Sequence, residues 1–199
     1  MSRCGCQYVP PYVLDQLEKS GEAEVAKAAK ATDAPIKKAR DSRAKQAVSL
    51  TQAQATSQVT ESAPPPTGTS RREIYDSETS ATQRKKLVRA EGDPATADTD
   101  VTAAYDSLGL VYTFFKDVLG RESIDNMGLD LIANVHYRKN YMNAFWDGDE
   151  MTFGDGDGVI FTSFAESLDV VAHELAHGVT QFTAGLVYRN QSGALNAHF

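Results

Sequence analysis

Apolar residues recur at intervals of three and four in two stretches of the chain, a spacing that places them on one face of a helix. Within residues 101–119 this stripe consists of Ala104, Leu108, Val111, Tyr112, Phe115 and Leu119. The Asp98–Asp100 segment can cap the start of this helix, and Gly120 can end it. Within residues 165–184 the stripe consists of Leu168, Val171, Leu175 and Val179. Both segments are therefore predicted to be helices that pack on a core.

Shorter apolar runs predict strands. They cover residues 72–76, 86–90 and 129–137, and a hairpin follows at residues 143–146 and 150–153. His136 is expected to be a strand residue with a local hydrogen bond, in preference to a metal ligand. The fold class that follows is α+β, with a mixed, mostly antiparallel sheet over residues 73–164 and the two helices packed on it.

Glycine and aspartate alternate from Gly154 to Gly158. Such a segment can suggest a calcium loop, but the further ligands of that loop, including its terminal glutamate, are missing. A turn held together by its own aspartate side chains is the favoured interpretation.

The N-terminal third has a different composition. Residues 1–62 contain few apolar positions outside a patch around Pro10 and Pro11, which predicts an extended stretch followed by weak helices at 22–31 and 34–47. Residues 63–72 are rich in Pro, Ser and Thr and predict a linker. The chain is thus expected to divide into residues 1–62, a linker at 63–72 and a globular part at 73–199.

Charge and composition narrow the function classes. The 199 residues carry a formal net charge of -7, which argues against a general nucleic-acid or anionic-membrane binder. No apolar run is long enough to span a membrane. The two cysteines, Cys4 and Cys6, lie too close for an ordinary structural disulfide. A standard signal peptide is absent, so we expect a cytoplasmic protein or export by a leaderless route.

The strongest chemical signal is the segment from His173 to His177, which reads His-Glu-Leu-Ala-His. Residues four apart share one helix face, so both imidazoles can reach a single zinc ion. Glu174 follows the first histidine and can take a proton from a water molecule at the metal. A chance occurrence of this spacing on an amphipathic helix is the alternative, and the surrounding segments decide between the two.

Six segments in order make the sequence resemble the thermolysin family of zinc endopeptidases. They are Val135–Tyr137, Asn143–Trp146, Gly154–Gly158, Asp169–His177, Thr183–Tyr188 and Ser192–Asn196. The Pro10–Leu14 element, ahead of a short, leaderless pro-region, resembles the protealysin-like subgroup. The implied fold is the N-terminal lobe of a thermolysin-like catalytic domain, preceded by a pro-region.

The resemblance also implies roles for single residues. His173 and His177 would be zinc ligands, Glu174 the base that activates water for attack on a peptide bond, and Tyr188 a group that stabilises the oxyanion. Asp169 matches a calcium position of calcium-rich members, and it could equally orient a ligating histidine or cap the helix.

The same resemblance implies two partners. A peptide or protein substrate would pair with the edge strand at Asn143 and Ala144, and Phe145 and Trp146 would form part of the cleft wall. The chain's own pro-region would lie in that cleft, with the Pro10–Tyr12 element filling the site that substrate side chains use.

One position departs from the family pattern. The third zinc ligand of the family is a glutamate, and the corresponding residue here is Ala197, whose methyl group cannot bind zinc. The second lobe of the family cleft is also expected to be missing. Three hypotheses follow: a zinc endopeptidase precursor whose chain is inactive alone, a catalytically dead module that binds peptides or a protease, and a residual fragment.

Overall fold

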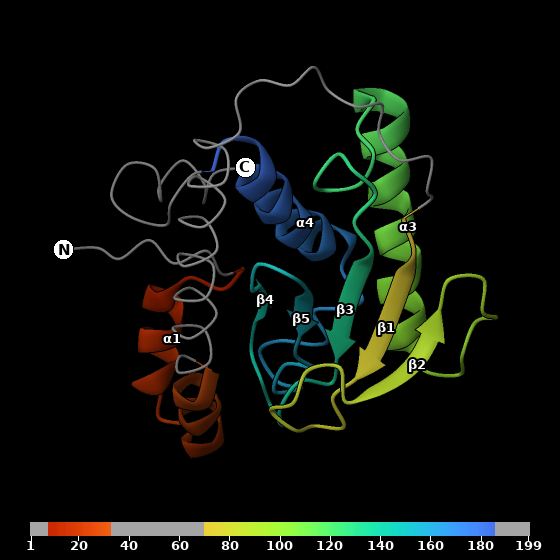
Figure 1. The fold of residues 1–199 in the computed structure, drawn as a ribbon. Helices are drawn as coiled ribbons and strands as arrows, with labels where there is room; N and C mark the ends of the chain where they lie inside the picture. The colour runs from red at the N-terminus through yellow and green to blue at the C-terminus, as the bar shows by residue number, and fades with distance from the viewer. Residues whose placement is uncertain (1–7, 33–69, 186–199) are drawn as a thin grey trace.

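The computed structural model describes residues 8–32 and 70–185. Its elements confirm the α+β class (Figure 1). In chain order they are α1 (Pro11–Glu18), β1 (Arg72–Asp76), β2 (Lys86–Ala90), α3 (Thr99–Leu119), β3 (Leu131–Val135), β4 (Ala144–Trp146), β5 (Met151–Phe153) and α4 (Leu168–Thr183). Residues 23–32 are also helical.

The five strands form one mixed sheet in the order β2-β1-β3-β5-β4. Its pairs divide evenly, because β1–β2 and β4–β5 are antiparallel while β1–β3 and β3–β5 are parallel. The parallel β1–β3 pair requires a crossover connection, and α3 lies within it. As a result β4, the strand predicted to meet substrate, lies at an edge of the sheet.

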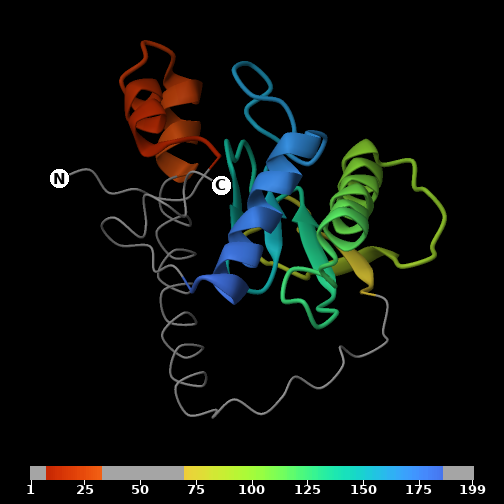
Figure 2. The same ribbon diagram turned by 90° about the horizontal axis from the view of Figure 1, so that it is seen from above.

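Helix α3 has the caps that its sequence predicts. The Asp98 side chain accepts hydrogen bonds from the backbone N–H groups of Asp100 and Val101, and Gly120 ends the helix at a φ of 62°. This left-handed conformation favours glycine. Figure 2 shows α3 and α4 side by side on one face of the sheet. They contact each other, α3 also contacts β1 and β3, and α4 contacts β4.

The N-terminal segment is helical where an extended stretch was expected. Helix α1 begins at Pro11, with Pro10 as its N-cap residue. Proline is well tolerated at the first helical position, because the N–H group it lacks would have no partner within the helix. Val9 and Leu14 are buried with the core of the globular part, whereas Tyr12 is 70% exposed. The Pro10–Tyr12 element was expected to fill the side-chain site; in the structure the Tyr12 end of this element is exposed, Pro10 and Pro11 are half-buried, and the buried side chains are those of Val9 and Leu14.

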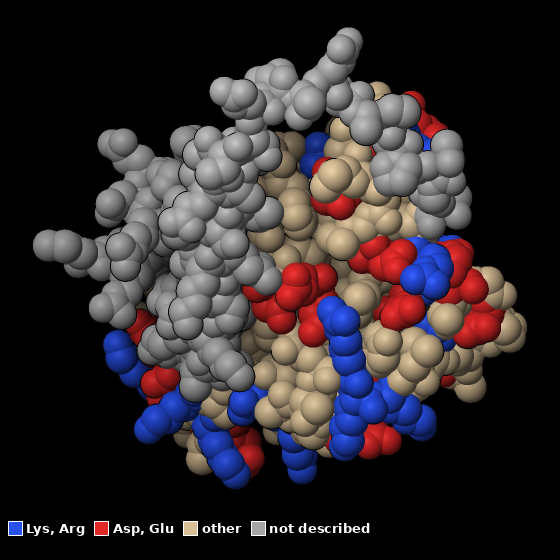
Figure 3. Space-filling model, in the orientation of Figure 1, with Lys and Arg blue, Asp and Glu red and all other residues tan. Residues whose placement is uncertain are grey.

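The surface seen in Figure 3 carries charges of both signs, with lysine and arginine gathered along the lower edge of this view. Several charges are paired locally, for example Arg71 with Asp130 at 2.9 Å. Within residues 8–32 and 70–185, none of the helices combines the length and apolar character needed to cross a bilayer.

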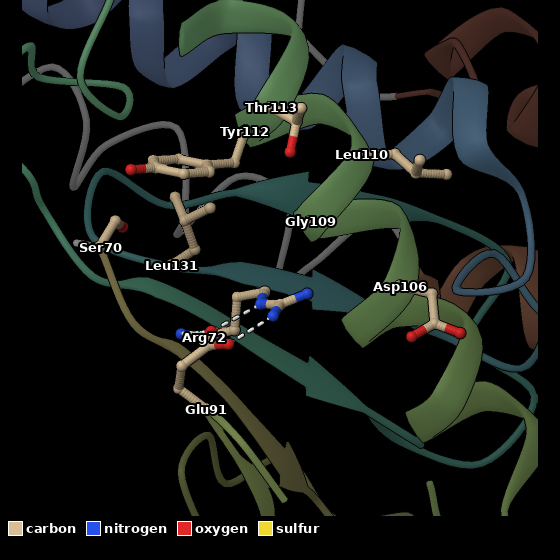
Figure 4. Close-up of a pocket in the computed structure, with 9 residues that line it drawn as sticks. All are labelled: Ser70, Arg72, Glu91, Asp106, Gly109, Leu110, Tyr112, Thr113 and Leu131. Carbon is tan, nitrogen blue, oxygen red and sulfur yellow. Dashed lines mark hydrogen bonds and ion pairs between the residues drawn. The ribbon is translucent and has the colours of Figure 1, made fainter. Parts of the chain in front are cut away.

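A surface pocket of about 650 Å³ lies beside α3, lined by residues that include Arg72, Glu91, Gly109 and Leu131 (Figure 4). The Arg72 guanidinium is paired with Glu91 and also lies 3.8 Å from the centre of the Tyr105 ring. Its charge is therefore already engaged, and the pocket contains none of the residues of the zinc motif.

Candidate metal centre

Helix α4 presents its two histidines to one point. The Nε2 atoms of His173 and His177 lie 3.0 Å apart, and the rings are edge-to-face with centroids at 4.4 Å. Two nitrogen ligands of a tetrahedral zinc ion, with bonds of about 2.0–2.1 Å, are separated by roughly 3.3 Å. The two imidazoles thus fit a zinc ion as a pair of ligands, with only a small adjustment.

Glu174 lies between these histidines in sequence and is completely buried, as is His177. A carboxylate withdrawn from bulk water beside a metal position is suited to accept and release a proton, because little solvent competes for it.

The hairpin of β4 and β5 is fastened to α4 through one glutamine. The indole N–H of Trp146 donates to Gln181 Oε1 at 3.0 Å, and Gln181 Nε2 donates to the Gly148 carbonyl at 3.1 Å. Gly178 allows close packing here, because a Cβ at this position would lie 3.1 Å from Ile124 Cδ1 and 3.4 Å from the Trp146 ring. The helix that carries the histidines is therefore held at a fixed distance from the edge strand.

The four residues predicted to bind substrate lie at this edge, and all four are buried. Phe145 packs edge-to-face on Tyr137 and Tyr141. Successive side chains of a strand point to opposite faces, so Trp146 packs against α4 while Phe145 packs on these two tyrosines on the other face of the sheet. Asn143 precedes β4, and Ala144 begins it.

Asn143 holds the N-terminal segment by its main chain. The Val9 N–H donates to Asn143 Oδ1 at 2.9 Å, and Asn143 Nδ2 donates to the Val9 carbonyl at 3.1 Å. Both contacts are buried. The backbone N–H of Met142 also donates to Thr32 Oγ1 at 3.1 Å. Residues far apart in the chain thus bring the N-terminal segment against the predicted substrate edge.

Tyr8 extends this contact to the zinc motif. Its ring lies edge-to-face on His173, with centroids at 6.0 Å, and on Phe164 at 6.1 Å. Its hydroxyl donates to Asp169 Oδ2 at 2.8 Å, while Ser167 Oγ donates to Asp169 Oδ1 at 2.7 Å. The hydrogen bonds from Ser167 and then Tyr8 lower the pKa of Asp169, and the bond to Asp169 raises the pKa of Tyr8.

The sequence model described as the catalytic domain of thermolysin metallopeptidase matches residues 36–181. The chain belongs to the thermolysin family. It is 53% identical over 131 residues to an extracellular metalloprotease of Pectobacterium carotovorum subsp. carotovorum, covering 66% of this chain and 38% of that protein. It is 51% identical over 125 residues to protease PrtS of Photorhabdus sp. (strain Az29), covering 63% of this chain and 34% of that protein.

Among solved structures, the precursor of protealysin, a metalloproteinase from Serratia proteamaculans, matches with a TM-score of 0.77 and 39% sequence identity. The match covers 96% of this chain and 51% of that one. The thermolysin-family chain described here thus spans about a third to a half of the length of these relatives, and its fold is that of a protealysin-like precursor.

A second group of ionisable side chains lies outside the zinc motif of this thermolysin-family chain. His136 follows β3 with a φ of 52°, so it is not the strand residue that was expected. Its Nε2 lies 3.0 Å from Asp98, and its Nδ1 lies 3.0 Å from Asp155 and 3.5 Å from Asp100. Asp100, His136 and Asp155 could together hold a metal ion. Sequence reasoning missed this group because its partners come from separate elements.

The charges within this group explain how it titrates. The hydrogen bond to Asp155, assisted by the bond to Asp98 and opposed by burial, raises the pKa of His136 to about 10. Burial raises the pKa of Asp100. Burial is also the largest single influence on Asp98, but the hydrogen bonds from His136 and from the backbone N–H groups of Val101 and Asp100, with the His136 charge, together outweigh it and lower the pKa of Asp98. An imidazolium shared by carboxylates from two segments, the start of α3 and the turn after β5, is the arrangement that these contacts favour.

The remaining predicted positions, Tyr188 and Ala197, lie outside the described residues, as do Cys4, Cys6 and the helix expected at residues 34–47. The interpretation of the Gly154–Gly158 segment as a turn is supported, because Asp157 Oδ1 accepts from the backbone N–H groups of Val159, Ile160 and Phe161.

Proposed function

We propose that this chain is the precursor form of a zinc endopeptidase lobe in which residues 8–32 occupy the substrate side of the zinc-motif helix. One observation carries the proposal: the paired Nε2 atoms of His173 and His177 lie beside an edge strand whose Asn143 already holds the main chain of Val9. The proposed division of the chain is a pro-region at residues 1–62, a linker at 63–72 and the lobe at 73–199.

In this proposal, His173 and His177 hold zinc, which when bound supplies a Lewis acid and lowers the pKa of water. Glu174 accepts a proton from the attacking water and passes it to the leaving amine. The β4 edge binds the substrate main chain in the manner of an added strand, and the Asn143 side-chain amide binds it as it binds the N–H and carbonyl of Val9 in the precursor. Tyr188 is proposed to donate to the developing oxyanion.

Two of the roles expected for Asp169 are proposed for the complete enzyme: it binds calcium, or it orients His173. Both of its carboxylate oxygens already accept hydrogen bonds, one from the Tyr8 hydroxyl and one from the Ser167 hydroxyl. A calcium ion at Asp169 would have to replace these donors, whereas a role in orienting His173 would leave them in place. Ser167 is the N-cap residue of α4, so Asp169 does not have the capping role.

Ala197 favours a second candidate, a catalytically dead module that binds peptides or an active protease. Catalytic zinc normally has three protein ligands, and in this chain two of those positions are histidines and the third is alanine. We therefore propose that the chain by itself is inactive, whatever the complete family member does.

Zinc stoichiometry and affinity, measured on the purified chain and on Ala197→Glu, separate these candidates. Little zinc in the parent and about one tight equivalent in Ala197→Glu would support the three-ligand site and the peptidase lineage. Tight zinc in the parent would mean that another residue completes the site. Zinc in neither protein, together with retained binding of Val9 by Asn143, would favour the binding module.

A further inference from the structure

Tyr8 makes contacts that a non-specific pro-segment would not need. Its hydroxyl reaches the carboxylate of Asp169, and its ring touches the edges of two rings, those of His173 and Phe164. The polar hydroxyl of Tyr8 thus has a polar partner, and its apolar ring has aromatic partners. Tyr12, four residues later, is 70% exposed, against 38% for Tyr8.

The position of Tyr8 is fixed by its neighbour. Because Asn143 binds both the N–H and the carbonyl of Val9, the segment has one register along the β4 edge. The side chain that precedes Val9 is then directed to the N-terminal half of α4, where Asp169 and His173 lie. A peptide bound through the same two hydrogen bonds would place the equivalent side chain in the same surroundings.

We propose that Phe164, Asp169 and His173 form a subsite for a tyrosine side chain, which Tyr8 occupies in this chain. In a peptide substrate the subsite selects tyrosine at the residue that precedes the one held by Asn143. This inference rests on the proposed function only in assigning the surface around Asn143 and α4 to substrate; the subsite itself is read from the Tyr8 contacts.

The chemistry of the three residues explains the choice of tyrosine. Phenylalanine would keep the edge-to-face contacts but return the Asp169 oxygen to water. An aliphatic side chain would lose the ring contacts as well. A phenol that donates to a carboxylate makes a charge-assisted hydrogen bond, stronger than a bond between neutral groups. Partial exposure of the site weakens this hydrogen bond. Removal of the Tyr8 hydroxyl is therefore expected to raise the population of the open state, in which Val9 has left Asn143, about fivefold to tenfold.

Hydrogen exchange of the Val9 amide in the full chain measures this opening, because that N–H is released only when the segment leaves Asn143. Tyr8→Phe and Asp169→Asn should each accelerate exchange about fivefold to tenfold, and the double variant should be no faster than either alone. Tyr12→Phe is the matched control and should leave the rate unchanged. Additive effects, or Tyr8→Phe exchanging at the parent rate, would overturn the proposal.

Competition by added peptides tests the selection of substrate. In the full-length Tyr8→Phe chain, acetyl-Tyr-Val-amide should displace the segment and accelerate Val9 exchange several-fold more than acetyl-Phe-Val-amide does at the same concentration. The difference should vanish when Asp169→Asn is added. Equal effects of the two peptides in the Tyr8→Phe chain would refute a tyrosine subsite.

These measurements need neither zinc nor turnover. If Ala197→Glu fails to bind zinc while the exchange results are as expected, the endopeptidase proposal fails and the tyrosine subsite stands. If zinc binds as expected while neither Tyr8→Phe nor Asp169→Asn changes the exchange rate of the Val9 amide, the tyrosine subsite fails and the endopeptidase proposal stands.

Discussion

His136→Gln tests whether the group of carboxylates around His136 stabilises the fold as an ion-pair network. The imidazole lies within 3.0 Å of Asp98 and Asp155 and 3.5 Å of Asp100, and its side chain is 22% exposed. Glutamine preserves much of the shape and hydrogen-bonding capacity but removes the positive charge and the titration.

The magnitude follows from the pKa. The surroundings raise the pKa of His136 from 6.5 to about 10, which sets an upper limit on the order of 5 kcal/mol, since a tenfold change in proton affinity is about 1.4 kcal/mol. Solvent screening of a partly exposed ring reduces this, and we expect about 2–3 kcal/mol. Because the folded pKa lies above the unfolded one, the contribution is complete below pH 6.5 and is lost as the pH rises to about 10.

Urea unfolding of the parent chain and of His136→Gln at several pH values between 6 and 10 measures this contribution directly. The difference in unfolding free energy should be largest near pH 6 and should shrink steadily toward pH 10. Asp149→Asn, which removes an exposed carboxylate from another loop, is the control and should leave the pH dependence as in the parent. A difference that stays constant across this range would show that His136 acts through packing alone and would refute the reasoning.

Three further predictions follow from single contacts. Asp157→Ala removes the acceptor of three backbone N–H groups in the turn after β5 and should lower the unfolding free energy by about 1–2 kcal/mol. Calcium chelation should leave the stability of the parent chain unchanged, and a loss of stability on chelation would instead indicate a calcium loop. Gln181→Leu breaks the link from Trp146 to Gly148 and should destabilise the chain by about 1–3 kcal/mol in thermal unfolding, whereas an unchanged midpoint would mean that the hairpin is held by packing. Trypsin should leave the Arg71–Arg72 bond intact in the folded chain, because Arg71 is bound to Asp130 and Arg72 is paired in β1; early cleavage there, detected by mass spectrometry, would contradict this.

Local signals predicted the main elements well. The bounds of α3 follow from Asp98 and Gly120, which act within one turn of the helix ends, and the zinc-motif helix follows from a regular apolar stripe. The start of α1 at Pro11 was missed, because proline disfavours a helix interior but fits a first turn.

Contacts between distant residues could not be predicted in the same way. His136 meets Asp98 and Asp155 across 38 and 19 residues, and Val9 meets Asn143 across 134. Periodicity and capping describe neighbours along the chain, whereas these pairs depend on strand order and on how the N-terminal segment returns to the sheet. The proximity of His173 and His177 was predictable because both histidines lie on one helix.

The two hydrogen bonds between Val9 and Asn143 have a consequence for how the N-terminal segment could be released. They join parts of one polypeptide, so a free peptide must compete with a ligand whose effective concentration is on the order of millimolar. Contacts that are individually weak can therefore keep Val9 bound to Asn143 while the chain is uncleaved. A single cut between α1 and β1 would leave the two bonds of Val9 unchanged yet make the segment a separate peptide, and dilution would then be enough to release it.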